Sequence, residues 1–261
     1  MNELDFFLRT LEERVDPTHL LERVVGAPAD PWQKTLLTTR SPFVMCLASR
    51  RIGKSQTTGV LAAQTVAEPD RTVLILSTTL SQSQLLFKKC LLAWSKMALP
   101  IKAVRATQTA LELENGSQIV CVPAGQDGES ARGHGVKNGG ILIYEEGAFL
   151  ADAVYDSTLP IREDGGRILI ITTPGRKGGV AHRFWTENDD VEKITARSTD
   201  LPRMAEKVAF DRKYMPPVKF AVEHDLAWMG AGGTPFFDST TIANSFVARP
   251  QLELGNIYAG L

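Results

Sequence analysis

A glycine–lysine–serine triplet, Gly53-Lys54-Ser55, constrains the fold of this chain more than any other feature. It follows a short apolar run at residues 43–47 and precedes a stretch rich in alanine, threonine and valine at 54–67. The first run is typical of a buried strand and the second of a helix. A strand, a loop and a helix in this order bind phosphate through backbone N–H groups at the helix start and through the lysine. The chain is therefore predicted to contain an α/β nucleotide-binding domain.

The loop differs from the usual pattern at two points. Ala48 stands where the first glycine is expected, and Arg50 and Arg51 fill the middle of the loop. We expect at least one of these arginines to face the nucleotide. Lys54 is expected to contact phosphate, and the Ser55 hydroxyl to bind Mg²⁺. The alternative is a chance Gly-Lys-Ser at a helix start. The neighbouring elements and the other motifs of the chain distinguish the two interpretations.

The surroundings indicate a parallel sheet. Further apolar runs at 72–77, 141–144, 167–172 and 192–196 alternate with helical patterns at 54–67, 78–97 and 180–186. Such alternation predicts a sheet covered by helices on both faces. Period-two alternation around Asn115-Gly116 predicts a hairpin within it. Two helices broken at Asp16-Pro17 are expected over 3–26, and short helices and loops over the last fifty residues.

Composition sets limits on partners and location. The 261 residues carry a net charge of about −1, so nucleic acid would have to bind a local basic patch. The three cysteines lie far apart in apolar runs, which indicates buried thiols in a reducing compartment. No apolar run is long enough to span a membrane, and the acidic start is not a signal peptide. Candidate phosphate-backbone contacts are Lys88, Lys89, Arg176, Lys177 and Arg183, although such charges more often form a solvated face.

Two carboxylates end the strand at 141–144. Glu145 and Glu146 suit a reaction in which one carboxylate lies near Mg²⁺ and the other orients an attacking water. Alone, the pair is more often a solvated strand end, and its combination with the loop at 49–55 makes the catalytic interpretation strong. Thr172 ends the next strand, where its hydroxyl either senses the terminal phosphate or belongs to an ordinary turn.

Two further residues are candidates on weaker grounds. Arg132 lies in a glycine-rich loop, where a mobile arginine can stabilise transition-state charge, although a surface arginine is more common. Gln33 offers a paired donor and acceptor that can read a base edge, although the residue by itself is better explained as a helix start over a packed Trp32.

In this order, the motifs resemble the large terminase subunit of tailed bacteriophages, an ATP-driven motor that pushes genomic DNA into a procapsid. The resemblance covers about residues 28–190, and an arginine-containing loop with alanine in place of glycine is itself typical of that family. The matching segments are DPWQ at 30–33, SRRIGKS at 49–55, ARG at 131–133, ILIYEEGAF at 141–149 and TTPG at 172–175.

The resemblance implies a role for each matching position. Glu146 would be the catalytic carboxylate, and Thr172 would begin the motif that couples hydrolysis to movement. Arg132 would be an arginine finger supplied to a neighbouring subunit. Ser55 and Glu145 would bind Mg²⁺, although the family usually has aspartate at the second position. Gln33 would lie near adenine, and the remaining contacts to ATP would come from Ser49, Arg50, Arg51, Ile52, Gly53 and Lys54.

The resemblance also implies an architecture and partners. The fold would be a P-loop NTPase of the ASCE type, with a mainly parallel sheet, an inserted hairpin and a small C-terminal subdomain. The expected parts are helices at 1–27, the ATPase core at 28–200, and a subdomain and linker at 201–261. Partners would be double-stranded DNA, a portal protein, a small terminase subunit and a pentameric ring of copies, in the host cytoplasm.

The expected activity is ATP hydrolysis with Mg²⁺ but without DNA cleavage, since the residues after Pro235 are too few for a nuclease domain. Two other interpretations stay open. One is a different P-loop ATPase, such as a helicase-like remodeller. The other is a nucleotide-binding assembly module with little turnover.

Overall fold

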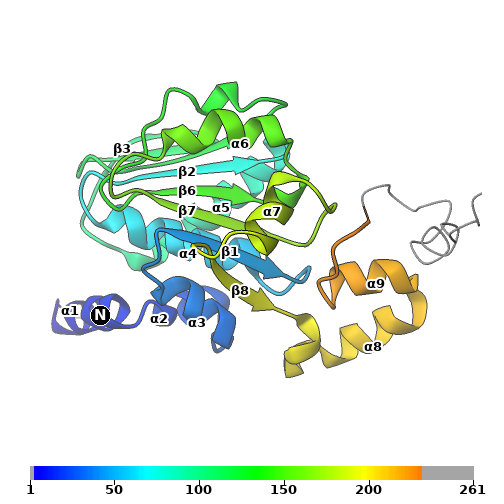
Figure 1. Cartoon of the computed structure of the whole chain (residues 1–261). Coiled ribbons are helices and arrows are strands. Elements are labelled where there is room, and N and C mark those ends of the chain that lie inside the picture. The colour runs from blue at the N-terminus through cyan, green and yellow to red at the C-terminus, as the bar shows by residue number, and fades with distance from the viewer. Residues whose placement is uncertain (1–2, 231–261) are drawn as a thin grey trace, which may run out of the picture. The chain divides into compact units, whose positions relative to one another are not determined.

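An eight-stranded sheet forms the centre of the molecule (Figure 1). The computed structural model describes residues 3–230, and up to residue 229 these belong to one compact unit. The strand order is β3-β4-β5-β2-β6-β7-β1-β8, with β3–β4 and β4–β5 antiparallel and the other pairs parallel. The strands are β1 (Phe43–Ala48), β2 (Thr72–Ser77), β3 (Ala103–Ala106), β4 (Ala110–Leu113), β5 (Gln118–Pro123), β6 (Ile141–Glu145), β7 (Arg167–Thr172) and β8 (Glu192–Ala196).

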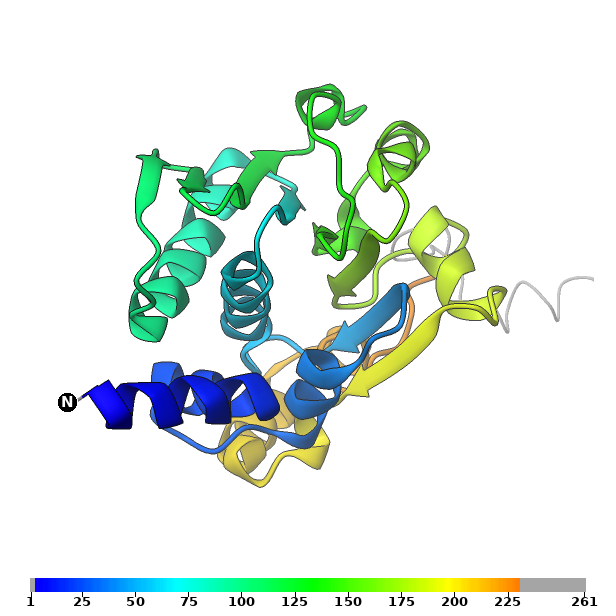
Figure 2. The ribbon, with the colours of Figure 1, turned by 90° about the vertical axis from the view of Figure 1, so that its left-hand side faces the viewer.

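Helices cover both faces of the sheet (Figures 1 and 2). Alternate residues of β1 show why two cores form: Val44 and Cys46 pack with α2 to α5, whereas Met45 and Leu47 pack with α6 and α7. The helices are α1 (Glu3–Val15), α2 (Thr18–Val25), α3 (Pro31–Thr38), α4 (Lys54–Ala67), α5 (Leu80–Met97), α6 (Asp152–Thr158), α7 (Val180–Thr186), α8 (Ala205–Tyr214) and α9 (Pro217–Glu223). The predicted α/β class with a mainly parallel sheet and a hairpin is confirmed.

Some elements differ from the sequence-based expectation. The edge strand β3 was not predicted, because all four of its residues are exposed and leave no apolar alternation to detect. The short helix α6 was not predicted either. Helix α5 begins at Leu80 and not at Thr78, because Thr79 caps it by accepting a hydrogen bond from the Gln82 backbone N–H at 3.3 Å.

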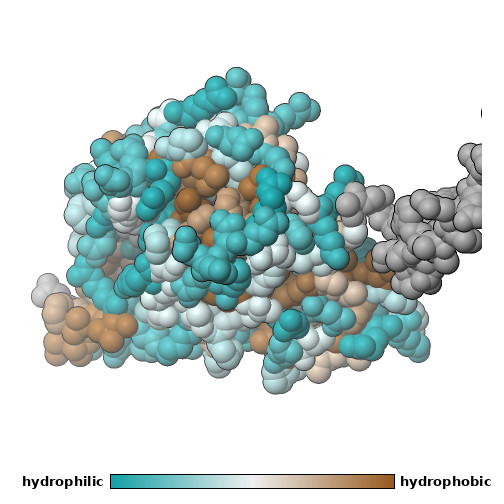
Figure 3. All heavy atoms as spheres, viewed as in Figure 1, coloured by the Kyte–Doolittle hydropathy of each residue, from teal (hydrophilic) through white to brown (hydrophobic). Residues whose placement is uncertain are grey.

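Helix α1 turns its polar side toward the body. Glu13 is buried and forms an ion pair with Arg23 of α2, so charge pairing holds the inner face of the helix. The apolar side chains of the helical pattern are exposed and form the brown area at the lower left of Figure 3: Leu4, Phe7, Leu8, Leu11 and Val15.

Helices α8 and α9 form the described part of the expected C-terminal subdomain. Residues 231–261, which include the expected linker around 231–237, lie outside the described residues. The division of the chain at residues 27 and 200 stays a prediction. Within residues 3–230, no helix is both long and apolar enough to cross a membrane.

Candidate active site

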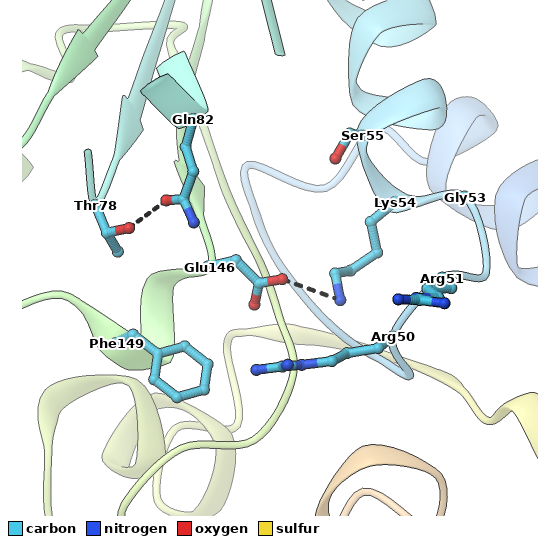
Figure 4. A pocket seen from close by; sticks show the side chains of 9 residues that line it. All are labelled: Arg50, Arg51, Gly53, Lys54, Ser55, Thr78, Gln82, Glu146 and Phe149. Carbon is cyan, nitrogen blue, oxygen red and sulfur yellow. Dashed lines mark hydrogen bonds and ion pairs between the residues drawn. The ribbon is translucent and has the colours of Figure 1, made fainter. Parts of the chain in front are cut away.

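The strand order gathers the candidate residues at one edge of the sheet. Strand β7 lies between β1 and β6, and all three are parallel, so the segments that follow them meet at their carboxyl ends. A cavity of about 570 Å³ opens there (Figure 4). It is lined by Arg50, Arg51, Gly53, Lys54, Ser55, Thr78, Gln82, Glu146 and Phe149.

The Lys54 ammonium is held at the centre of this cavity. The side chain is buried, and Nζ donates to the carbonyl oxygens of Ala48 at 3.2 Å and Ser49 at 3.4 Å. It also forms an ion pair with Glu146 Oε1 at 3.2 Å (Figure 4). The loop therefore holds a buried cation against the carboxylate that ends β6, ninety-two positions further along the chain.

Glu146 is held in an unusual backbone conformation. Its φ of 51° and ψ of 42° are left-handed, which costs a residue with a Cβ about 1–3 kcal/mol. Glu146 Oε2 accepts hydrogen bonds from the Thr173 N–H and hydroxyl, both at 3.1 Å. Thr172 is fully buried, and its hydroxyl lies 3.5 Å from the same oxygen. These contacts orient the Glu146 carboxylate toward the cavity. Thr172 contacts the same carboxylate but does not itself line the cavity.

Glu145 carries a carboxylate oxygen without a partner. Oε1 accepts a hydrogen bond from the Ser55 hydroxyl at 2.9 Å, but the buried Oε2 has no hydrogen-bond partner within residues 3–230. Burial, and secondarily the charge of Glu146, raises the pKa of Glu145 to about 7, against the opposing effects of Ser55 and Lys54. A buried, unpaired carboxylate oxygen beside a hydroxyl suits a divalent cation.

Gly53 and Gln33 pack against each other and stabilise the conformation of the loop. Gly53 has a φ of +104°, and a Cβ there would lie 3.1 Å from Gln33 Nε2. Gln33 is buried; its Oε1 accepts from the Asp30 N–H at 2.8 Å, and its Nε2 donates to the Thr57 hydroxyl at 2.9 Å. The amide thus starts α3 and supports the loop, and its contact with adenine stays a prediction.

The arginines have different surroundings. Arg50 and Arg51 both line the cavity, and Arg50 also pairs with Glu223 of α9 at 3.5 Å. Arg132 is exposed, follows the turn Glu129–Ala131, and does not line the cavity. Its proposed role toward a neighbouring chain stays untested. The sequence did not point to Arg203, which donates to the Ile52 carbonyl oxygen at 2.8 Å and holds the loop from outside the cavity.

The side chain of Ser49 faces away from the cavity, toward the C-terminal helices. Its hydroxyl donates to the His224 carbonyl oxygen at 3.1 Å and accepts from the Ser198 N–H at 3.0 Å. Ser198 Oγ lies 2.7 Å from His224 Nδ1, and His224 Nε2 lies 3.0 Å from Asp211 Oδ2. Ser198 is completely buried, so this serine–histidine–aspartate cluster cannot reach a substrate. It anchors the loop at 49–55 to the end of α9.

Sequence analysis missed three residues of the cavity wall: Thr78, Gln82 and Phe149. The positions of Thr78 and Gln82 could have been predicted from the sequence. They follow β2, a continuous apolar strand next to β6, so the rule that ligands bind beyond the carboxyl ends of parallel strands applies to them as well.

Solved structures resemble this chain, although no protein-family model and no curated protein matches it. The large terminase ATPase domain of Thermus phage P74-26, in a variant with one arginine replaced by alanine, aligns with a TM-score of 0.65 and 18% identity, over 80% of this chain and 97% of that domain. This chain has the fold of a phage large-terminase ATPase domain. That fold is the P-loop NTPase fold, as the motifs indicated.

Two further large terminases give the same result. The large terminase of a thermophilic bacteriophage, solved in complex with ADP, aligns with a TM-score of 0.59 and 13% identity over 77% of this chain. The HK97 bacteriophage large terminase aligns with a TM-score of 0.55 and 14% identity over 81% of it. In both cases this chain spans 54% of the matched protein. The resemblance seen in the motifs is thus confirmed for the fold.

Proposed function

We propose that this chain is the ATPase module of a phage DNA-packaging motor. The observation that supports this best is the ion pair of 3.2 Å between Lys54 and Glu146, which line a cavity large enough for the phosphates of a nucleotide. Two segments with no local relation in the sequence place a phosphate-binding cation against a carboxylate. The terminase of the thermophilic phage, which shares the fold, has been solved with ADP and with ATP-γ-S.

In the proposed reaction, Lys54 leaves Glu146 and binds the phosphates of ATP. The freed carboxylate then accepts a proton from a water that attacks the terminal phosphorus, and the bond from that phosphorus to the ADP oxygen breaks. Thr173 holds Glu146 in place through two hydrogen bonds at 3.1 Å. Thr172 and the residues after it transmit the change to the rest of the motor.

The Ser55 hydroxyl and the unpaired Glu145 oxygen are the groups that would hold Mg²⁺. No group of three histidine, cysteine or acidic side chains that could hold a metal occurs within residues 3–230. This fits Mg²⁺, which usually binds one or two protein groups together with phosphate oxygens and water. When bound, the ion neutralises phosphate charge. Glu145 stands where the family usually has aspartate, and its hydrogen bond with Ser55 supports the proposal that the longer side chain would share the ion with that hydroxyl.

The proposed motor needs further components. Arg132 is exposed and would act on the nucleotide of a neighbouring copy, which requires the chains to associate. The proposed assembly is a ring of five chains. Double-stranded DNA would be the substrate that moves, with a portal protein and a small terminase subunit as partners in the host cytoplasm. Arg50 and Arg51 would contact the phosphates of their own nucleotide.

Steady-state hydrolysis of ATP by the purified chain tests the proposal. We expect phosphate release that requires Mg²⁺ and disappears in Lys54→Ala, because that variant lacks the buried cation. A circular dichroism spectrum serves as the folding control. Nucleotide binding without Mg²⁺-dependent turnover, in the presence of DNA and at concentrations that allow assembly, would favour a binding module over a motor.

A further inference from the structure

The wall of the cavity opposite the phosphate loop carries an uncharged hydrogen-bond donor, the side-chain amide of Gln82, which has no role in the proposed reaction. Gln82 lies in the first turn of α5, and Thr78 lies just after β2; both line the cavity. The Thr78 hydroxyl donates to Gln82 Oε1, which fixes the orientation of the amide. Figure 4 shows the Gln82 nitrogen pointing toward the interior of the cavity.

This orientation decides what Gln82 can bind. Its oxygen is already occupied by Thr78, and Nε2 forms no hydrogen bond with another described residue, so the amide offers N–H groups to the cavity. An attacking water needs an acceptor for its proton, and Glu146 is that acceptor. An N–H donor is instead complementary to an oxygen of a phosphate.

The position of Gln82 indicates which phosphate it contacts. Lys54, Ser55 and the arginines come from the loop side, and Glu146 lies between that side and Gln82 (Figure 4). A group bound by the loop and reaching past Glu146 is the terminal phosphate of a nucleoside triphosphate. An uncharged amide is also compatible with the proposed base. A second cation at this position would form an ion pair with Glu146 and lower the basicity of its carboxylate.

We infer that Gln82 donates a hydrogen bond to the terminal phosphate of ATP and that Thr78 positions its amide for this contact. The inference rests on the proposed function and adds a residue that distinguishes ATP from ADP. Hydrogen bonds to charged groups contribute about 1.5 kcal/mol or more, which corresponds to about tenfold in affinity.

The test compares affinities of the full chain for ATP-γ-S and for ADP, measured by calorimetry with Mg²⁺. Gln82→Ala is expected to lower the preference for ATP-γ-S over ADP about tenfold and to leave the affinity for ADP unchanged. Gln82→Glu keeps an acceptor for Thr78 but has no N–H, so it should lower the preference at least as much. Gln84→Ala is the matched control, since that amide pairs with Gln108 outside the cavity.

Each other outcome overturns the inference. An unchanged preference in Gln82→Ala, an equal loss of ADP affinity, or an equal effect of Gln84→Ala would each show that Gln82 makes no contact with the terminal phosphate. Failure of the proposed function looks different. In that case the unaltered chain itself binds no ATP-γ-S or releases no phosphate from ATP, whatever residue occupies position 82.

Discussion

The replacement Glu146→Gln separates binding from chemistry in this site. The variant keeps an amide oxygen that can accept from the Thr173 N–H, so the backbone around residue 146 is retained. It loses the group that, in the proposed reaction, accepts the proton of the attacking water. Loss of a general base lowers turnover by about 10²–10⁴, or about 3–5 kcal/mol in the activation barrier.

The affinity for ATP should not fall together with turnover in this variant. At 3.2 Å and an effective dielectric constant of about 20, the attraction between Lys54 and Glu146 is about 5 kcal/mol before desolvation. ATP has to displace Lys54 from this pair, and the variant removes that cost. Because the ammonium exchanges the carboxylate for phosphate oxygens and the freed carboxylate regains water, most of this attraction is offset. We therefore expect ATP affinity that is unchanged or up to about tenfold higher.

The assay is phosphate release in a single turnover, together with equilibrium binding of a fluorescent ATP analogue. Glu112→Gln is the matched control, since this carboxylate pairs with Arg105 on the exposed hairpin. Turnover within tenfold of the unaltered chain would refute the role of Glu146 as base. A large loss of ATP affinity would refute the conclusion that its carboxylate competes for Lys54.

Three further predictions concern stability, measured by urea unfolding. Gly53→Ala should lose about 1–3 kcal/mol, since its φ of +104° is unsuited to a residue with a Cβ. Ser198→Ala should lose about 1–3 kcal/mol, because it leaves buried His224 Nδ1 without its partner. Asp16→Asn should lose about 1 kcal/mol at neutral pH, since the Asp16 side chain accepts from the start of α2 and pairs with Lys34. These contacts lower the pKa of Asp16, so its contribution is complete above its ordinary value of 3.8 and disappears as the pH falls toward its folded-state pKa.

Controls make these three predictions decisive. Gly125→Ala is a second glycine with positive φ, but nothing lies near its missing Cβ, so it isolates the backbone cost from the contact with Gln33. An unfolding free energy of Ser198→Ala equal to that of the unaltered chain would contradict the anchoring role of the cluster. For Asp16→Asn, a stability difference that persists unchanged at pH 2 would contradict the assignment to the ionised carboxylate.

Several features were readable from the sequence because their causes are local. Helix α4 and strand β2 begin and end where predicted, since a continuous apolar run and a glycine-flanked helical pattern mark them directly. The Asn115-Gly116 turn also follows from two adjacent residues. Strand β3 escaped prediction because an exposed edge strand needs no apolar side chains.

The sequence by itself determined the candidate residues of the site: the loop at 49–55, two carboxylates at 145–146 and hydroxyls at 172–173, each at the end of a strand. Only the tertiary structure decided their relations. The position of β7 between β1 and β6 places Glu146 on Lys54, and the packing of the end of α9 beside the end of β8 brings His224 to Ser49. The same order puts Gln82 across the cavity from the loop. Such contacts join residues up to 175 positions apart. A local sequence pattern cannot predict them, because strand order is set by the packing of the whole sheet and not by any one segment.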